Sequence, residues 1–455
     1  MNAPDERARE RQKLREQLRK AMADLGDLGG VYAADQYTKK VEIGKLRRRG
    51  GVPPRDPTRT LTLVENKEGV LLWEEGPVLS RSIPGLRRAY RAAAAQGDVV
   101  DHIVVEPLEP SQVGQALTWI DSKLTPKQGL RAWNGKNLGT PDDSVKPVPN
   151  GRILLFIHGT FSQSEAILGQ LTGKGNKEGN ALLARAGKTY DQILAFDHPT
   201  LSVSPMLNAV DLERRLEGSK ADVDVVCHSR GGLVTRWWLE AFGHPVGQRR
   251  AVFVGSPLDG TSLAAPPRLR SVLSWFSNLN KALAKGAELG SSLIPFLSVI
   301  SCLARFTATV TSLAAKTPVI DAAVAMIPGL AAMSRTSNNF ELQRLNGSSG
   351  ARENHFAIKS HFQPKDPGWK FWEYFVDQPL RRAAESLFPG ENDLVVDTTS
   401  MTVVEAEPVQ GSGRKLLEIP AKRLYDFGGT DSVHHTNYFL QTKTCEKIAE
   451  WLKIQ

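Results

Sequence analysis

One run of ten residues limits the fold more than any other part of the chain: residues 223–232, with the sequence VDVVCHSRGG. Its β-branched first half predicts a buried strand, and residues 233–239 predict a helix. Between them lies Ser229, followed closely by two glycines that would let the helix pack against the strand. This order of strand, serine turn and helix is typical of a nucleophile elbow, which raises the serine hydroxyl above the edge of a sheet.

One position departs from the elbow pattern Gly-x-Ser-x-Gly, because Cys227 replaces the first glycine. Cysteine is a small residue, and the turn is expected to accept it. The alternative interpretation is an ordinary turn between a strand and a helix, in which Ser229 caps the helix. The segments described next favour the elbow.

A second apolar run, residues 151–157, predicts another buried strand and leads into His158-Gly159-Thr160-Phe161. In enzymes with an elbow, a backbone N–H of such a loop and the N–H after the nucleophile stabilise the oxyanion. We expect Thr160 and Arg230 to supply these two groups. Phe161 is the alternative to Thr160 and a candidate contact for substrate. His158 is interpreted as a turn residue that supports the loop.

The acid and the base of a serine triad should follow the nucleophile in the order acid, then histidine. Asp393 lies in a turn before an apolar run, with Asp397 and Glu391 as alternatives nearby. Only two histidines follow it, His434 and His435. We predict His435 as the general base and keep His434 as the alternative.

These segments resemble the lipase-like serine hydrolases of the α/β-hydrolase fold, a group that includes bacterial lipases and deacylases of lipid-anchored proteins. The resemblance also includes residues 254–261 (VGSPLDGT), which are similar to the strand and turn after the nucleophile helix of such lipases. It covers about residues 150–455. Asp259 departs from the pattern of that turn and is a further alternative for the acid.

The resemblance implies an α/β fold: a mostly parallel sheet with helices on both faces and a helical lid or cap. Its triad would be Ser229, Asp393 and His435, and the chemistry would need no metal or organic cofactor. Asp197 and His198 follow a further strand-like run, at the sheet edge where ligands bind in such folds. We expect them to shape the substrate pocket, and the alternative interpretation is a polar turn before Pro199.

Four regions are expected along the chain. Residues 1–29 predict a charged amphipathic helix, and residues 30–125 a small α+β accessory region with strand-like runs at 60–64 and 70–73 and a helix near 111–122. Residues 126–150 are rich in glycine, proline, lysine and asparagine and predict a linker. Residues 151–455 form the hydrolase domain, with the apolar lid or cap at about 265–335.

The net charge of +9 is uneven, because residues 1–60 hold 15 lysines and arginines against nine acidic residues. A basic region of this kind suits contact with the phosphate groups of a membrane surface, and the alternative, which we favour, is an ordinary solvated surface. The amphipathic helix in the same region is a candidate for binding a protein partner. No nucleic acid is expected as a partner, because the sequence has no zinc-finger, recognition-helix or aromatic RNA-binding signature.

The compartment is predicted from what the sequence lacks. No secretory signal or membrane-spanning run is visible, which favours the cytoplasm, with export without a signal as the alternative. Cys227, Cys302 and Cys445 are far apart, so neither a disulfide framework nor a zinc site is expected.

The resulting expectation is a serine esterase or lipase that hydrolyses carboxylic esters of lipids or other apolar acyl groups through an acyl-enzyme. One alternative is an acyltransferase that uses the same triad and excludes water. The other is a non-catalytic, hydrolase-like module that binds a partner through the N-terminal helix and its basic residues.

Overall fold

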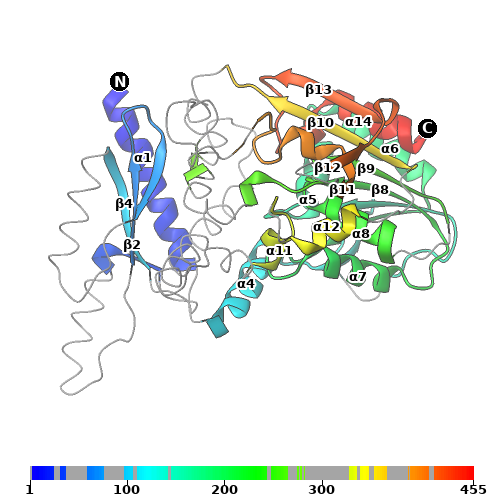
Figure 1. Ribbon diagram of the computed structural model, residues 1–455, viewed down its shortest axis with the longest axis horizontal. Coiled ribbons are helices and arrows are strands. Elements are labelled where there is room, and N and C mark those ends of the chain that lie inside the picture. Colours follow the sequence, from blue (N-terminus) through cyan, green and yellow to red (C-terminus); the bar gives the residue numbers. More distant parts are fainter. Residues whose placement is uncertain are drawn as a thin grey trace. The chain divides into compact units, whose positions relative to one another are not determined.

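The computed structural model divides into two compact units. Unit 1 comprises Met1–Ala116, Pro266–Ala323 and Asp366–Leu387, and unit 2 comprises Leu117–Ala265, Val324–Lys365 and Phe388–Gln455. The residues that the structure describes are 3–24, 31–36, 59–75, 97–105, 110–141, 145–242, 247–264, 274–275, 277–278, 281, 327–335, 339–347, 353–365, 388, 390–408 and 414–455. Figure 1 labels the elements, and each unit is described by itself.

Unit 1 contains a four-stranded antiparallel sheet in the order β1-β4-β2-β3. A long helix, α1, packs against β4 and β1 through its apolar stripe, in which Leu18 and Met22 are buried. Arginines on α1 form ion pairs with the sheet, among them Arg19 with Asp101 at 2.9 Å. The elements of this unit are α1 Ala3–Asp24, β1 Val31–Ala33, β2 Arg59–Glu65, β3 Leu71–Glu75 and β4 Asp98–Val105.

Unit 2 is built on a seven-stranded sheet in the order β13-β10-β9-β8-β6-β7-β5. All neighbouring strands are parallel except β5, which pairs antiparallel with β7 at one edge. The prediction of an α/β fold with a mostly parallel sheet is therefore confirmed. The strands are β5 Gly129–Ala132, β6 Arg152–Ile157, β7 Gln192–Asp197, β8 Asp222–His228, β9 Arg249–Val254, β10 His355–Phe362 and β13 Leu424–Thr430.

Helices cover both faces of this sheet, because its central strands are apolar on both sides. In β6, Ile153, Leu155 and Ile157 pack on one face, while Leu154 and Phe156 pack on the other. The helices are α4 Pro110–Leu124, α5 Ser164–Leu171, α6 Lys177–Thr189, α7 Pro205–Leu216, α8 Gly231–Trp237, α11 Pro328–Ala331, α12 Phe340–Asn346 and α14 Thr442–Leu452.

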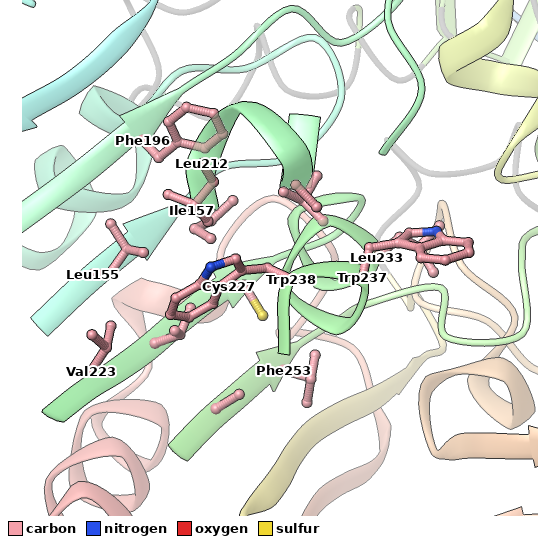
Figure 2. Packing of buried hydrophobic residues seen from close by; sticks show 14 of the residues in the cluster. Leu155, Ile157, Phe196, Leu212, Val223, Cys227, Leu233, Trp237, Trp238 and Phe253 are labelled. Carbon is pink, nitrogen blue, oxygen red and sulfur yellow. The ribbon is translucent and has the colours of Figure 1, made fainter. Parts of the chain in front are cut away.

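The core on the α7 and α8 face is shown in Figure 2. Trp238, which is fully buried, lies there with Cys227 and Phe253 from the centre of the sheet. On the opposite face, residues of α5, α6 and α14 complete the second core cluster. The central strands are thus held on both sides, which fixes the sheet edge where β8 and β9 end.

The linker prediction for residues 126–150 is wrong in part, because residues 129–132 form β5 and pair with β7. The sequence does not reveal this strand, because it has only four residues and polar and glycine-rich segments flank it. A short strand at the edge of a sheet can form without a clear alternation of apolar and polar residues. The predicted lid or cap at 265–335 falls largely outside the described residues. A further hairpin, β11 Val403–Pro408 and β12 Arg414–Glu418, follows the predicted acid.

Among the helices of the described residues, none has both the length and the apolar character required to cross a bilayer.

Candidate active site

Ser229 occupies the sharp turn between β8 and α8, with a backbone φ of +54°. A positive φ is rare for a residue with a side chain, and such strain concentrates at functional sites. The turn is fixed by hydrogen bonds from Ser229 N–H to the Val254 carbonyl (3.0 Å) and from Gly232 N–H to the Ser229 carbonyl (2.9 Å). The elbow predicted from the sequence is therefore present in the backbone.

The two glycines after Ser229 are required by close packing. A Cβ atom at Gly231 would lie 2.6 Å from the carbonyl oxygens of Ile157 and His158. A Cβ atom at Gly232 would lie 2.4 Å from the Ser256 hydroxyl oxygen. Both distances are far shorter than a van der Waals contact, so only glycine lets α8 begin this close to β6 and β9.

Cys227 is accepted at the first glycine position because its side chain lies in the core. The thiol is fully buried and belongs to the cluster on the α8 face of the sheet. Burial raises the pKa of Cys227 to about 12, so the group is a thiol at neutral pH and behaves as a small apolar side chain.

His435 and Asp393 form a buried pair. The carboxylate oxygen Oδ2 of Asp393 lies 2.9 Å from Nδ1 of His435. Its other oxygen, Oδ1, accepts the backbone N–H groups of Val395 (3.2 Å) and Val396 (2.9 Å). A carboxylate can only accept, so Nδ1 carries the proton and Nε2 has a free lone pair. This is the tautomer that a general base needs.

The alternative acids have other partners. Asp397 accepts the backbone N–H of Ser262 at 2.8 Å and its hydroxyl at 3.0 Å. Glu391 is 65% exposed at its side chain and pairs with His361. Asp259 accepts the Asn346 amide at 2.9 Å. Of the four candidates, only Asp393 is hydrogen-bonded, within the described residues, to a histidine that comes after it in the chain.

His434, the alternative base, is positioned differently from its neighbour. Its Nδ1 lies 3.0 Å from the Thr436 hydroxyl, and its ring packs edge-on against Phe362. Burial lowers the pKa of His434 to about 4, so the ring is neutral at physiological pH. The geometry therefore favours His435.

His228, the residue before Ser229, contacts the segment that carries His435. Nε2 of His228 donates to the His435 carbonyl at 2.8 Å, and the two rings lie 4.7 Å apart. Burial lowers the pKa of His228 to about 3, which keeps this ring neutral. A Cβ atom at Gly255, just after β9, would lie 3.4 Å from Nδ1 of His435. Strand ends β8 and β9 thus bring Ser229 and His435 to one edge of the sheet.

No hydrogen bond joins the Ser229 hydroxyl to the His435 ring in the described part of the chain. Hydrogen bonds of this kind are often long without substrate and shorten in the Michaelis complex. Ser229 is 6% exposed as a residue and the His435 side chain is 7% exposed, so both are mostly shielded from solvent.

The loop after β6 lies directly on the nucleophile. A Cβ atom at Gly159 would be 2.5 Å from Cβ and 3.1 Å from Oγ of Ser229. Phe161 also has a positive φ (+56°), and its N–H donates to the Thr200 hydroxyl at 3.4 Å. Within the described residues the N–H groups of Thr160 and Arg230 donate no hydrogen bond. They are therefore available for an oxyanion, while that of Phe161 is engaged.

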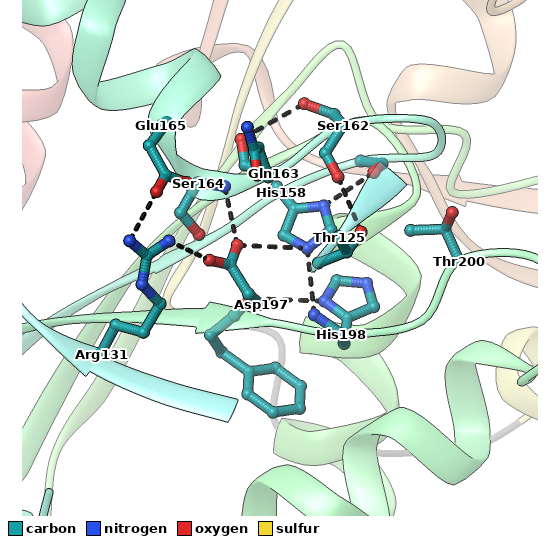
Figure 3. A network of polar contacts seen from close by, with 12 residues as sticks. Thr125, Arg131, His158, Ser162, Gln163, Ser164, Glu165, Asp197, His198 and Thr200 are labelled. Carbon is teal, nitrogen blue, oxygen red and sulfur yellow. Dashed lines mark hydrogen bonds and ion pairs between the residues drawn. The ribbon is translucent and has the colours of Figure 1, made fainter. Parts of the chain in front are cut away.

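Asp197 and His198 hold this loop instead of facing substrate, which corrects their predicted role. Figure 3 shows the network. Asp197 is 1% exposed; its carboxylate pairs with the buried Arg131 and accepts the Ser164 N–H at 2.7 Å. The His198 N–H donates to Nε2 of His158 at 3.1 Å, and Nδ1 of His158 donates to the Gly159 carbonyl at 2.9 Å. The supporting role predicted for His158 is confirmed.

Sequence reasoning missed a second supporting residue, Asp121 on α4. Its carboxylate accepts the backbone N–H groups of Thr200, Leu201 and Ser202 at 2.7–3.1 Å, and the Ser202 hydroxyl at 2.6 Å. Thr200 in turn accepts the Phe161 N–H. Asp121 therefore fixes the loop that braces the oxyanion segment. An aspartate in an amphipathic helix gives no sequence signal of this role.

The Arg230 side chain is a buried charge with incomplete pairing. It is fully buried, and its Nη2 donates to the Val203 carbonyl, while Nε and Nη1 have no partner among the described residues. Burial lowers the pKa of Arg230 to about 10, so it stays protonated at neutral pH. The equally buried Arg236 makes a two-pronged ion pair with Glu240. A positive charge thus belongs to the residue whose N–H is expected at the oxyanion.

Among the described residues, no group of three or more histidine, cysteine, aspartate or glutamate side chains is arranged to hold a metal ion.

Residues 123–453 match the model of a protein family described as a domain of unknown function, DUF7379. The chain belongs to the DUF7379 family. The matched region contains Ser229, Asp393 and His435, and it begins two residues after Asp121. Curated proteins give no match to the chain.

Solved structures similar to this DUF7379 member include two proteins titled as lipases and the protein MenH. Mature lipase BlEst2 from Bacillus licheniformis is 15% identical, with a TM-score of 0.35, covering 70% of this chain and 97% of that chain. Lipase 1 from Pelosinus fermentans is 13% identical, with a TM-score of 0.38 and coverages of 66% and 98%. MenH from S. aureus is 13% identical, with a TM-score of 0.31 and coverages of 68% and 96%.

Proposed function

We propose that this protein is a serine hydrolase that cleaves carboxylic esters of lipids or other apolar acyl groups. One observation carries the proposal: a buried, hydrogen-bonded pair of His435 and Asp393 lies at the sheet edge where Ser229 occupies a strained turn. Positioned nucleophile, base and acid of this type activate a serine hydroxyl for attack on a carbonyl.

In the proposed reaction the Ser229 hydroxyl oxygen attacks the ester carbonyl carbon, and Nε2 of His435 takes the hydroxyl proton. The negative charge that forms on the carbonyl oxygen is held by the N–H groups of Thr160 and Arg230. The tetrahedral species collapses to an acyl-enzyme, and His435 gives its proton to the departing alcohol. Water, activated by the same histidine, attacks the acyl-enzyme and releases the carboxylic acid and free Ser229.

Asp393 stays ionised through this cycle and stabilises the imidazolium that forms on His435. The four donors around its carboxylate, from His435, Tyr438, Val395 and Val396, keep the negative charge in place. Arg230 adds a buried positive charge on the residue that supplies one oxyanion N–H. A charge in a water-poor site acts on a developing anion more strongly than it would in water.

The preference for apolar acyl groups is inferred from the composition of residues 265–335. This segment lies in the chain between the strand after the nucleophile helix and the acid, and residues 289–304 contain no charged side chain. An apolar segment at this place in the chain suits an acyl-binding lid or cap that contacts lipid. The basic residues near the N-terminus suit an anionic membrane surface.

The first test is hydrolysis of 4-nitrophenyl esters with acyl chains from acetyl to palmitoyl, with and without vesicles of phosphatidylcholine and phosphatidylglycerol. We expect turnover that increases from acetyl to medium-chain esters and is enhanced by vesicles for the longer esters. The matched control is Ser229→Ala, which should lower kcat by about 10⁴-fold or more. Equal rates for the wild type and this variant on every ester would refute ester hydrolysis by Ser229.

A further inference from the structure

Tyr438 supplies a buried phenol to the carboxylate of the acid–base pair. Its hydroxyl lies 3.0 Å from Oδ2 of Asp393, the same oxygen that receives Nδ1–H of His435 at 2.9 Å. Both Tyr438 and Asp393 are fully buried. Building on the proposed hydrolase function, we propose that Tyr438 is a positioning residue: its hydroxyl orients Asp393 and limits how strongly that carboxylate holds a proton on His435.

The direction of the hydrogen bonds follows from the chemistry of the groups. Burial and the nearby carboxylate raise the pKa of Tyr438 well above its ordinary value, so the phenol keeps its single proton. Asp393 can only accept, so that proton points to Oδ2. The Ser360 hydroxyl, 2.8 Å from the phenol oxygen, must then donate to Tyr438. A relay of donors therefore runs from Ser360 through Tyr438 to Asp393.

The relay is anchored by elements on both sides. Ser360 belongs to β10 and is fully buried, and its carbonyl accepts the Thr398 hydroxyl at 3.1 Å. Tyr438 begins a short 3₁₀ turn, Tyr438–Leu440, three residues after His435. One short segment thus carries both the base and the phenol that acts on its acid.

Two side chains from a distant part of the chain donate hydrogen bonds to the backbone of residues 436–439. The Gln170 amide donates to the Thr436 carbonyl at 2.9 Å, and the Asn176 amide donates to the Phe439 carbonyl at 2.8 Å. Gln170 lies on α5 and Asn176 caps α6, and both helices pack in the core cluster that also contains Tyr438 and Phe439. The backbone on either side of His435 and Tyr438 is therefore fixed, as a positioning device requires.

Gly255 shows how closely the three groups are packed. A Cβ atom there would lie 2.7 Å from the Tyr438 ring, 3.1 Å from Oδ2 of Asp393 and 3.4 Å from Nδ1 of His435. The end of β9 therefore forms one wall of the space that holds phenol, carboxylate and imidazole. No side chain fits on this wall without moving at least one of them.

The expected electrostatic effect has a definite sign. A hydrogen bond donated to a carboxylate draws negative charge toward the donor and weakens the attraction of that carboxylate for other protons. Without the phenol, Asp393 attracts the imidazolium form of His435 more strongly. The neutral form, which acts as the base, is then reached only at higher pH.

The test is the variant Tyr438→Phe, studied by the pH dependence of kcat/KM on the best ester. We expect the midpoint of the acidic limb, on which the rate rises with pH, to move up by about 0.5–1 pH unit, the equivalent of one ordinary hydrogen bond. Below the midpoint the rate should fall by about 3- to 10-fold, while above it the loss should be much smaller. Ser360→Ala, which removes only the outer donor, should shift the midpoint in the same direction by less.

The matched control is Tyr190→Phe. The Tyr190 hydroxyl also donates to a buried carboxylate, Asp224, at 2.6 Å, in a cluster with Arg152 and Arg250 near the start of β8. Its loss should reduce stability without moving the midpoint. A purely structural role for Tyr438 predicts that the two phenylalanine variants behave alike.

A direct titration separates this inference from the proposed function. In protein labelled with ¹³C at histidine Cε1, the His435 resonance should titrate at higher pH in Tyr438→Phe than in the wild type, whether or not an ester is turned over. An unchanged His435 titration, or an equal shift in Tyr190→Phe, would overturn the inference. If Tyr438→Phe does not fold, the same titration on Ser360→Ala decides it: a shift supports the relay, and no shift rejects it. Failure of the hydrolase function would appear separately, as wild-type protein with no ester turnover.

Discussion

Replacing His435 by alanine is expected to lower kcat by about 10⁴- to 10⁶-fold on the best ester, close to the loss in Ser229→Ala. The reason is that Nε2 of His435 takes the Ser229 proton in the proposed reaction, and among the described residues His435 is the histidine hydrogen-bonded to Asp393. The variant should still fold, because the backbone N–H of residue 435 remains bonded to the Asp393 carbonyl at 2.9 Å. Initial rates measure the loss of kcat, and thermal unfolding curves of the same samples show whether the variant is folded.

His434→Ala is the matched control, since it removes the same side chain from the adjacent position. Its imidazole contacts the Thr436 hydroxyl and Phe362 rather than Asp393. We therefore expect kcat within about 10-fold of the wild type, with a loss of stability of about 1–3 kcal/mol from the lost contacts of this half-buried side chain. The opposite pattern, an inactive His434→Ala and an active His435→Ala, would show that the base is assigned to the wrong residue.

Asp393→Asn is expected to lower kcat by about 10⁴-fold while leaving the fold intact. An amide at this position has a similar shape, and its oxygen can still accept the N–H groups of Val395 and Val396. It lacks the charge that stabilises the imidazolium, and it no longer enforces the Nδ1–H tautomer of His435. Steady-state kinetics and a circular dichroism spectrum of the variant check the two parts of this prediction.

Asp397→Asn serves as the comparison for the acid. Its carboxylate bonds to Ser262 and lies 3.7 Å from Arg335, so the change should act mainly on stability. We expect its kcat to stay within about 10-fold of the wild type. Full activity in Asp393→Asn together with a large loss in Asp397→Asn would transfer the role of the acid to Asp397.

Much of the candidate site follows from local sequence patterns. The elbow at Ser229 needs only a strand, a serine turn and two glycines in order, and each of these leaves a signal over ten residues. Asp393 and His435 were inferred from their order along the chain, because the topology of such folds brings the ends of successive parallel strands to one edge. The structure joins these two residues by a hydrogen bond.

The roles of Asp197 and His198 show what local patterns leave out. Both follow a strand at the edge where ligands bind, which is why the sequence favours a pocket role. In the structure the Asp197 carboxylate forms an ion pair with Arg131. Arg131 lies on β5, a strand that the sequence does not reveal. Once this buried pair is formed, the aspartate braces the loop after β6 and is closed to solvent.

The roles of Asp121 and Tyr438 likewise depend on partners far away in the chain. Asp121 binds a loop some 80 residues later, and Tyr438 meets Asp393, which lies 45 residues earlier. Neither residue type in its local context differs from an ordinary helix or core residue. Only the folded structure shows that Asp121 is bonded to residues 200–202 and that Tyr438 is bonded to Asp393.

The most direct measurement of the central claim is labelling with a fluorophosphonate probe, followed by mass spectrometry of the digested protein. The serine-nucleophile account predicts a single phosphonyl adduct on the peptide that contains Ser229, no adduct in Ser229→Ala, and much slower labelling in His435→Ala. Folded wild-type protein that stays unlabelled, or an adduct on a different residue that persists in Ser229→Ala, would contradict it.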